Sequence, residues 1–148
     1  MIVIQPIDSL PYDGLSALVT EADANGFRAL SRLLSEWRSG LNRFDQPGEA
    51  LFIAADNGRV VGVCRLNRDP YAGDPTVGRV RHLYVAVDHR RKKIGTQLVR
   101  AVVAAAQGHF ARLRLKTDNA GADAFYQSIG FTTVAGEPSC SHQLVFDN

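Results

Sequence analysis

The chain has 148 residues, of which 45% are apolar and 22% are charged, and its formal net charge is +2. This size and composition are typical of one globular unit with its own core, so we expect a single domain over residues 1–148. No stretch approaches the roughly 20 apolar residues of a membrane span. A net charge this small does not require a nucleic-acid partner.

The cysteine pattern indicates the compartment. Cys64 and Cys140 lie far apart and outside any Cys-x-x-Cys pair. This predicts buried thiols in a reducing cytoplasm, with no disulfide framework and no metal site. Residues 1–6 have no basic segment ahead of a hydrophobic one, so they predict a first strand and not a signal peptide. We expect a cytoplasmic protein with no membrane partner.

Two helices are predicted in the first third of the chain. Ser9 is placed to cap a helix over residues 10–24. A second helix over residues 27–40 carries apolar residues at helical spacing and ends at Gly40. Its Trp37 fits the core, and its place near the helix end also allows it to line a substrate cleft.

A loop over residues 41–49 follows, and it contains Arg43 and Glu49. Loops on a rigid scaffold often carry binding groups, although a solvated connector would show the same composition. After the loop, Asn57-Gly58 separates two apolar runs. This dipeptide predicts an antiparallel hairpin of residues 50–56 and 59–66.

The second half of the chain alternates strands and helices. The predicted elements are strand 79–87, helix 94–108, strand 111–117, a helix over 120–129 capped by Asp118 or Asn119, and strands 131–135 and 141–146. A strand-helix-strand order predicts parallel pairing of the first two strands. Ligands favour the edge beyond the carboxyl ends of such strands, which is where the turn after residue 87 and Asn119 should lie.

That turn carries four consecutive basic residues, Arg90, Arg91, Lys92 and Lys93, just before Gly95. A helix N-terminus leaves N–H groups unpaired and attracts anions, and a glycine lets a ligand approach the backbone. The turn therefore predicts a diphosphate site, although a solvated basic face has the same composition. The Walker and Gly-x-Gly-x-x-Gly patterns are absent, which argues against nucleotide hydrolysis and dinucleotide binding.

Two segments resemble signatures of the GCN5-related N-acetyltransferases (GNAT). In the first, Leu83-Tyr84-Val85 precedes a turn, and Arg90 and Gly95 fill the outer positions of the motif Gln/Arg-x-x-Gly-x-Gly/Ala. Lys93 stands where the motif has its first glycine, at a backbone position that needs φ > 0 and costs a lysine some strain. The second signature is a strand, Asn119, and the helix with Phe125-Tyr126 that ends in Gly130-Phe131.

The resemblance implies an α/β fold with a mixed, mostly antiparallel central sheet of six to seven strands flanked by about four helices. It implies acetyl-CoA as co-substrate, with pantetheine along the strand and diphosphate on the basic turn. Tyr126 would give a proton to the departing thiolate, unless it is a core aromatic. Asn119 would hydrogen-bond near the acyl group, or else cap its helix. The implied cofactor-binding residues are Leu83, Tyr84, Val85, Val87, Arg90, Arg91, Lys92, Lys93, Ile94, Gly95, Thr96, Asn119 and Tyr126.

The acceptor amine must lose a proton before it attacks. In well-known members of the family a glutamate on the central strand takes this proton, but this strand has no carboxylate. His82, Glu49 and the less favourable His142 are the open candidates for the base. Arg79 and Arg81 stay protonated and can grip a carboxylate or phosphate, which predicts an amine acceptor that also bears an anionic group.

Period-2 counting predicts which face of the central strand each of these side chains occupies. It places Arg79, Arg81, Leu83 and Val85 on one face and Val80, His82 and Tyr84 on the other. The predicted substrate-binding residues are Trp37, Arg43, Arg79 and Arg81.

The sequence thus predicts direct transfer of an acetyl group from acetyl-CoA to an amine of a small molecule or peptide, without a covalent acyl-enzyme, because no cysteine nucleophile is placed for one. Three alternatives stay open: a non-catalytic acyl-CoA sensor, a nucleic-acid binder that uses the basic turn, and an acetyltransferase acting on an amine attached to RNA. Monomer and homodimer are both compatible with the sequence.

Overall fold

The computed structural model describes residues 1–147 and forms a seven-stranded sheet with four α-helices and one 3₁₀ turn within that range. The elements are β1 (Ile2–Ile7), α1 (Tyr12–Ala24), α2 (Ala29–Ser39), β2 (Ala50–Asp56), β3 (Arg59–Arg68), β4 (Val77–Val85), η1 (Val87–His89), α3 (Ile94–Ala106), β5 (Arg112–Leu115), α4 (Ala120–Ile129), β6 (Thr132–Thr133) and β7 (His142–Val145).

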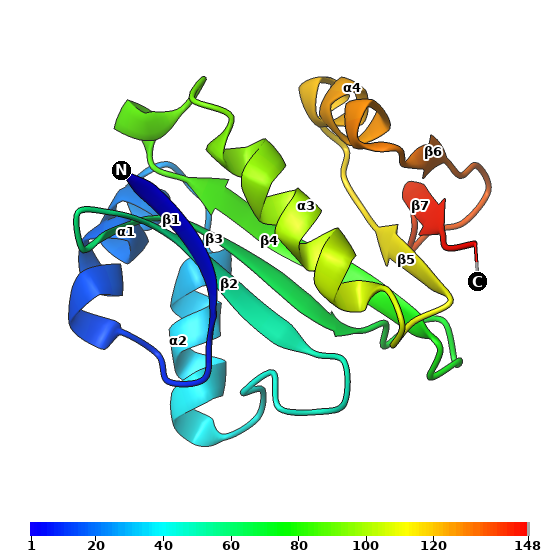
Figure 1. The fold of residues 1–148 in the computed structure, drawn as a ribbon, viewed down its shortest axis with the longest axis horizontal. Helices are drawn as coiled ribbons and strands as arrows, with labels where there is room; N and C mark the ends of the chain where they lie inside the picture. Colours follow the sequence, from blue (N-terminus) through cyan, green and yellow to red (C-terminus); the bar gives the residue numbers. More distant parts are fainter. Residues whose placement is uncertain (148) are drawn as a thin grey trace.

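The strand order is β1-β2-β3-β4-β5-β7-β6 (Figure 1). The β4–β5 pair is parallel and the other pairs are antiparallel. The short β4–β5 ladder joins Val77, Gly78 and Arg79 to residues 112–114, at the amino end of β4. Beyond this ladder the two strands diverge toward their carboxyl ends, as Figure 1 shows. This confirms the predicted mixed sheet and its parallel pair.

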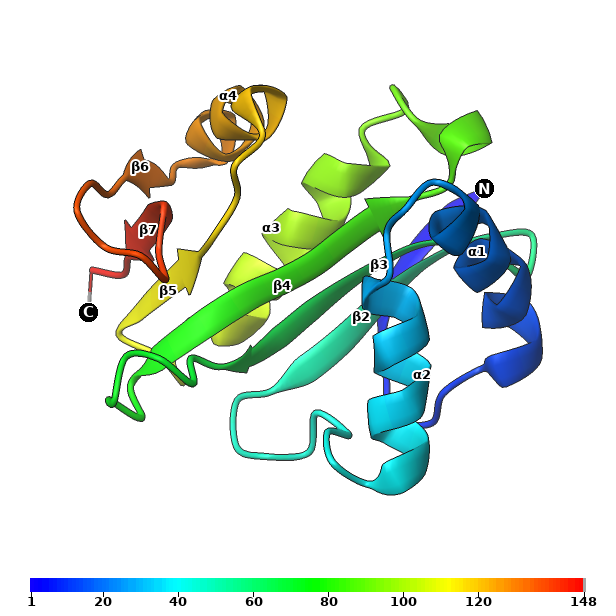
Figure 2. The same ribbon diagram turned by 180° about the vertical axis from the view of Figure 1, so that it is seen from behind.

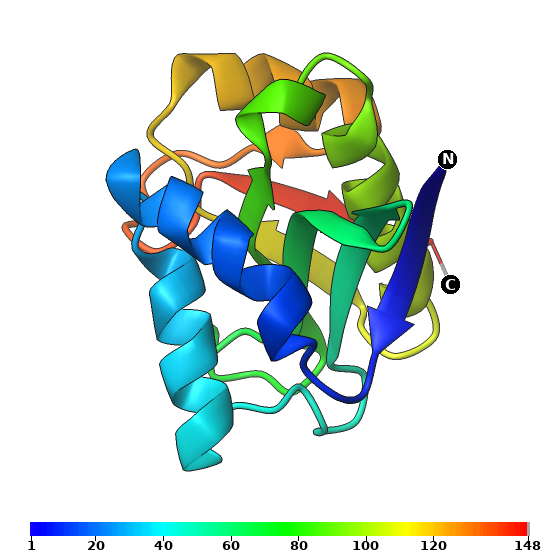
Figure 3. The same cartoon turned by 90° about the vertical axis from the view of Figure 1, so that its left-hand side faces the viewer.

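Helices cover both faces of the sheet. Seen from behind, α1 and α2 lie across β2 to β4 (Figure 2), and the side view shows them separated from α3 by the sheet (Figure 3). α3 presents its buried residues, among them Leu98 and Val102, to the sheet, and α4 packs beside α3 and β6. None of the helices within residues 1–147 combines the length and the apolar character needed to cross a membrane.

Several local predictions are confirmed, and the predicted Ser9 cap is wrong. Asn57 and Gly58 both have positive φ, as a tight hairpin between β2 and β3 requires, and Gly40 ends α2 in the left-handed conformation. Cys64 and Cys140 are buried and free. Ser9 does not cap α1: the helix begins at Tyr12 after Pro11, and no side chain caps it. Pro11 takes the N-cap position, and its side chain has no oxygen that could accept from the first N–H groups of the helix.

The face prediction for β4 is wrong beyond Arg81 because the strand contains a β-bulge. Arg65 pairs with Arg81 and Val63 pairs with Tyr84, so three steps along β4 match two along β3. His82 has φ 55°, which accommodates the extra residue. Arg81 and Tyr84 therefore lie on the same face of the sheet, and period-2 counting fails across the bulge.

Candidate functional site

A groove of about 690 Å³ opens beyond the carboxyl end of β4, and we call it the basic groove. Its walls come from β4, the basic turn, the start of α3, the α1–α2 connection and α4. The lining residues are Asn25, Phe27, Leu83, Tyr84, Val85, His89, Arg90, Arg91, Lys93, Ile94, Gly95, Thr96 and Phe125.

The backbone of the basic turn is held in an unusual conformation. Arg91 has φ 65° and Lys93 has φ 61°, both in the left-handed region that non-glycine residues seldom adopt. Lys93 is the N-cap of α3, and no side chain caps this helix. The first N–H groups of α3, at Ile94 to Thr96, therefore face the groove with the positive end of the helix dipole behind them. Two strained residues in one turn are typical of a functional site.

Glycine at position 95 keeps the start of α3 open. A Cβ built there would come within 3.6 Å of Phe125 and 3.7 Å of Leu83, both of which line the groove. These are ordinary contacts, so the fold itself tolerates a side chain at this position. The added atom would instead occupy groove space in front of the unpaired amides. The geometry fits a ligand that approaches the backbone closely.

A histidine anchors the turn to the body of the sheet. The imidazole of His89 lies 2.9 Å from Asp56 Oδ2 and 2.8 Å from Asp88 Oδ1. The bonds to Asp88 and Asp56 raise its pKa. Arg59 also donates to Asp88, at 3.1 Å. These contacts join η1 to the β2–β3 hairpin, so they hold the residues just before the basic turn in place.

Two side chains occupy the edge of β4 along the groove. Arg90 Nε donates to Val85 O at 3.0 Å, and its guanidinium lies over the Tyr84 ring. From α1, Glu21 accepts hydrogen bonds from the Tyr84 hydroxyl at 2.5 Å and from Val87 N at 3.3 Å. The backbone groups Val85 O and Val87 N are thus each bonded to a side chain. Among residues 1–147, no side chain hydrogen-bonds the first N–H groups of α3 in this way.

A second hollow, of about 260 Å³, lies where β4 and β5 diverge, and we call it the β4–β5 pocket. It is lined by Tyr71, Arg79, Val80, Arg81, His82, Leu115, Lys116 and Tyr126. Consecutive residues divide between the two hollows: His82 lines the pocket and Leu83 the groove, and Tyr126 lines the pocket and Phe125 the groove. The groove and the pocket therefore adjoin at β4 and α4.

Tyr126 is the aromatic residue at this junction. Its side chain is largely buried, with edge-to-face contacts to Phe125 and Phe131. Burial raises the pKa of Tyr126 above its ordinary value, so the hydroxyl stays protonated. Within residues 1–147 no protein group hydrogen-bonds that hydroxyl. A phenol without a protein partner at a cavity wall is available to a ligand.

Arginines surround His82. Arg65 is fully buried, donates to Glu36 at 2.8 Å, and points a second N–H at His82 Nδ1, 2.5 Å away. Because a guanidinium only donates, Nδ1 must accept and the proton of the neutral ring sits on Nε2. Burial, followed by the charges of Arg65 and Arg81, lowers the pKa of His82 to about 3. His82 is therefore neutral and a weak base.

The family model of the GNAT acetyltransferases matches residues 16–131, a range that holds every residue lining the groove and the pocket. The chain belongs to this family. A solved structure from Exiguobacterium sp. 255-15, assigned as an acetyltransferase, is 30% identical, with a TM-score of 0.84 over 98% of this chain and 93% of that one. No curated protein sequence matches the chain.

Two more distant structures share the GNAT fold. Glucosamine-6-phosphate N-acetyltransferase from Arabidopsis thaliana is 12% identical with a TM-score of 0.66, over 94% of this chain and 97% of that one. A chain of the NatC complex bound to Gag peptide and CoA is 19% identical with a TM-score of 0.71, over 99% and 98%. At these identities the likeness concerns the fold. The GNAT resemblance seen in the sequence is confirmed by the family match.

Most of the predicted cofactor-binding residues of this GNAT protein meet in the basic groove. Val87, Lys92, Asn119 and Tyr126 are not among the lining residues, and Tyr126 lines the β4–β5 pocket instead. The Asn119 side chain caps α4 by accepting from Gly121 N at 2.8 Å and Ala122 N at 3.3 Å, so its capping role is the one observed. Val87 reaches the site only through its backbone N–H.

Three residues predicted for the acceptor side lie elsewhere. Trp37 is 9% exposed and its ring packs against Phe44, which places it in the core. Arg43 donates to Trp37 O at 3.0 Å. Glu49 accepts from Asn67 Nδ2 and Arg68 N, each at 3.0 Å, and so braces its loop. Arg43 and Glu49 line a separate hollow beside β1, so the structure does not bring them to Tyr126. His142 is bonded to Ser141 and Asp123.

The sequence reasoning missed Glu21, Arg65 and Phe125 as parts of the site. Glu21 sits in α1, more than 60 residues from its partners Tyr84 and Val87, so no local pattern indicates it. The apolar surroundings of Arg65 in β3 were a usable signal, because a buried arginine needs partners. Phe125 belongs to the second signature, and that motif does not indicate that the side chain lines the groove.

Proposed function

We propose that this protein is an acetyl-CoA-dependent N-acetyltransferase acting on an amine of a small molecule or peptide. The observation that carries the proposal is the junction of the two hollows. A carrier with its diphosphate at the start of α3 and its arm along β4 would end at Tyr126, where the β4–β5 pocket supplies space for an acceptor. The GNAT membership supports acetyl transfer, and the pocket supports a separate acceptor.

The residues of the groove fit the carrier by chemistry. The α3 amides and the side chains of Arg91 and Lys93 would hold the diphosphate, since each is a donor. The residues that line the groove include no carboxylate in the part of the chain that the structure describes, and Glu21, at its edge, is bonded to Tyr84 and Val87. Arg90 would leave Val85 O, and Glu21 would leave Val87 N, so that the pantetheine arm could pair with the strand edge. Acetyl-CoA would supply the activated acetyl group as a thioester.

Tyr126 would protonate the departing thiolate. A phenol with a raised pKa is held in its acid form at neutral pH, and a hydroxyl with no protein partner can turn toward the sulfur. An ammonium acceptor would release its first proton to solvent before it attacks the thioester carbonyl. As the C–S bond breaks, the proton that the new amide nitrogen loses would return through solvent to Tyr126, so this arrangement needs no carboxylate base next to the amine. The guanidinium charges near His82 would lower the pKa of an ammonium group in the pocket and favour its neutral form. His82 would keep Arg65 in place through Nδ1 and would not take the proton.

One observation favours a second candidate, a non-catalytic acyl-CoA sensor. No carboxylate lines the β4–β5 pocket in the part of the chain that the structure describes. A sensor would bind the carrier and transfer nothing.

Two measurements on the purified chain separate these functions. Calorimetry with acetyl-CoA should give saturable binding, and acetyl-CoA at about 100 times its dissociation constant should stabilise the fold by about 2.7 kcal/mol. Thiol release in a screen of amines, corrected for hydrolysis, should identify an acceptor. Binding with no amine-dependent release would support the sensor, and absence of binding would overturn both functions.

A further inference from the structure

The charged side chains that line the β4–β5 pocket are all cationic. Three cationic side chains, Arg79, Arg81 and Lys116, contribute to its wall, and the described residues place no carboxylate in that wall. Arg65 lies beside Arg81, because the two residues pair across the β3–β4 ladder. A cavity walled by cations is a place where an anion is stabilised.

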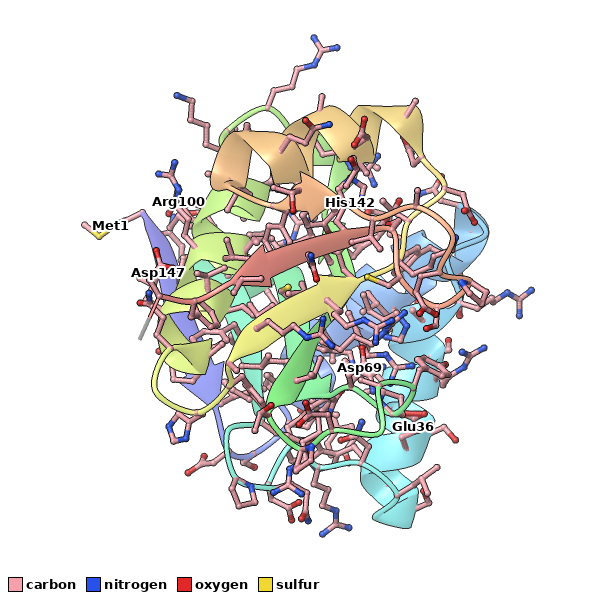
Figure 4. The ribbon with its side chains drawn as sticks, turned by 90° about the vertical axis from the view of Figure 1, so that its right-hand side faces the viewer. Met1, Glu36, Asp69, Arg100, His142 and Asp147 are labelled. Carbon is pink, nitrogen blue, oxygen red and sulfur yellow. The ribbon has the colours of Figure 1, made fainter. Side chains whose placement is uncertain are left out.

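Most of these cations already have an anionic partner. Arg79 donates to Asp69 at 3.0 Å, Arg65 donates to Glu36 at 2.8 Å, and Lys116 lies 3.3 Å from Asp118. Figure 4 labels Asp69 and Glu36, the partners of Arg79 and Arg65. Arg81 differs, because within residues 1–147 it makes neither a hydrogen bond nor an ion pair. Its side chain is only partly exposed, so solvent screens its charge incompletely.

Holding Arg81 beside Arg65 and Arg79 costs stability through like-charge repulsion. Arg65 Nε is in addition buried without a hydrogen-bond partner. A fold that keeps an unpaired guanidinium next to two others gains nothing structural from it. The arrangement becomes favourable once a negatively charged group enters the pocket and pairs with the guanidinium fork of Arg81.

We propose that the β4–β5 pocket binds the oxyanion group, a carboxylate or a phosphate, of a small amine acceptor, and that Arg81 is its main partner. The proposal rests on the function proposed above and names the class of acceptor. The amine end lies toward Tyr126, where the pocket meets the groove, and the oxyanion end lies toward Arg81. A volume of about 260 Å³ suits a small amino acid or aminoalkyl phosphate.

Matched acceptors test the proposal by kinetics. With acetyl-CoA saturating, 3-aminopropanoate and 2-aminoethyl phosphate serve as oxyanion probes, and 3-aminopropanamide serves as the uncharged probe. Arg81→Gln should raise KM for the oxyanion probes by roughly 10- to 100-fold more than for the amide, because only the oxyanion probes lose a binding partner. Any effect of the lost charge on the amine is common to all three probes, so the ratio of their KM values is the readout. Arg100→Gln is the matched control, since Arg100 is exposed on α3, across the sheet from Glu36 (Figure 4).

An NMR titration that measures binding without turnover is the second test. The oxyanion probes are titrated into the ¹⁵N-labelled protein with saturating CoA, and amide shifts are followed in the wild type, Arg81→Gln and Arg100→Gln. The proposal expects shifts at residues 79–82 that vanish in Arg81→Gln alone. Equal shifts in all three proteins, or none in the wild type, would overturn it. A short oligonucleotide that shifts these residues while the small probes do not would overturn it in favour of nucleic acid.

The two proposals fail separately. CoA binding is measured in the same samples before the probes are added, and Arg81→Gln should leave it unchanged because Arg81 does not line the groove. Loss of CoA binding in the wild type would overturn the acetyltransferase function. Intact CoA binding with an Arg81-independent preference among the probes would overturn only the oxyanion site.

Discussion

The basic groove and the β4–β5 pocket adjoin, yet different chemical groups line them. The groove presents the backbone amides of α3 together with a contiguous turn, whereas the pocket presents side chains from a loop, two strands and a helix. Backbone amides discriminate little among carriers with the same diphosphate, but side chains at fixed positions discriminate among acceptors. The difference teaches that one fold can keep its donor chemistry while its acceptor changes.

The two hollows also differ in which of their interactions destabilise the fold. In the groove the destabilising feature is the left-handed backbone of Arg91 and Lys93. In the pocket it is desolvation and charge, as the depressed pKa of His82 indicates. Variants that relieve one kind of cost should leave the other hollow unchanged.

The largest effect is expected at the junction of the hollows. Tyr126→Phe should lower kcat by roughly 100-fold, because a positioned acid contributes about 10² or more to the rate. Its thermal stability should stay near that of the wild type, since the hydroxyl has no protein partner among residues 1–147. Stopped-assay kinetics and calorimetry measure the two. Tyr12→Phe, on α1, is the control, and an unchanged kcat in Tyr126→Phe would assign the tyrosine to the core.

Acidification should weaken the fold through the pocket. The pKa of His82 is about 3 in the folded chain and near 6.5 when unfolded, so below pH 6.5 the unfolded chain binds the extra proton. Stability should therefore fall as pH drops, by about 2 kcal/mol at pH 5 from this group alone, and the contribution is absent above pH 7. His82→Asn keeps an acceptor for Arg65 and tolerates the positive φ, so its stability should depend less on pH.

Urea unfolding at pH 7 and pH 5 measures this difference. His109→Asn, at an exposed histidine, is the control and should behave as the wild type does. Parallel pH dependence of the wild type and His82→Asn would contradict the environment described for His82.

Gly95→Ala should separate ligand binding from folding. We expect acetyl-CoA to bind roughly tenfold more weakly, because the Cβ enters the groove, while stability rises by up to about 1 kcal/mol from the better helix former. Calorimetry and thermal melts report each part. The control is Gly121→Ala. Gly121 is the second residue of α4, as Gly95 is of α3, but it does not line the groove, so this variant should leave acetyl-CoA binding unchanged. Unaltered binding in Gly95→Ala would mean that the ligand does not approach the α3 amides.

The smallest effect concerns backbone strain in the turn. Lys93→Gly should stabilise the fold by about 0.5 kcal/mol, as the net of relieved left-handed strain and added chain entropy. Lys92→Gly removes the same charge at a residue without positive φ, so it should not stabilise. Equilibrium unfolding of both variants gives the comparison. Equal stability of the two variants would show that the left-handed conformation at Lys93 carries no cost.

Much of the groove could be predicted because its parts are neighbours in the chain. A strand, a basic turn and a glycine at a helix start are joined within about 15 residues, so local chemistry fixes their relation in space. The hairpin at Asn57-Gly58 and the Asn119 cap were predictable for the same reason. The Ser9 cap was wrong because proline, two residues on, already defines the helix start.

The pocket was only partly predictable. Arg79 and Arg81, which the sequence indicates through their charge, line the pocket together, but the bulge at His82 changed the faces beyond them. Trp37, Arg43 and Glu49 have side chains suited to binding. Their residue types could not show that Trp37 packs in the core and that Arg43 and Glu49 line a separate hollow beside β1.

The sequence by itself determined the GNAT family, the mixed sheet and the basic turn, because each depends on residues close in the chain or on repeated spacing. The tertiary structure alone decided that Glu21 meets Val87, that Arg65 meets His82 and Glu36, and that Arg81 is left without a partner. These contacts join residues 17 to 66 positions apart. Their geometry follows from how strands and helices pack, and a bulge of one residue is enough to redirect it.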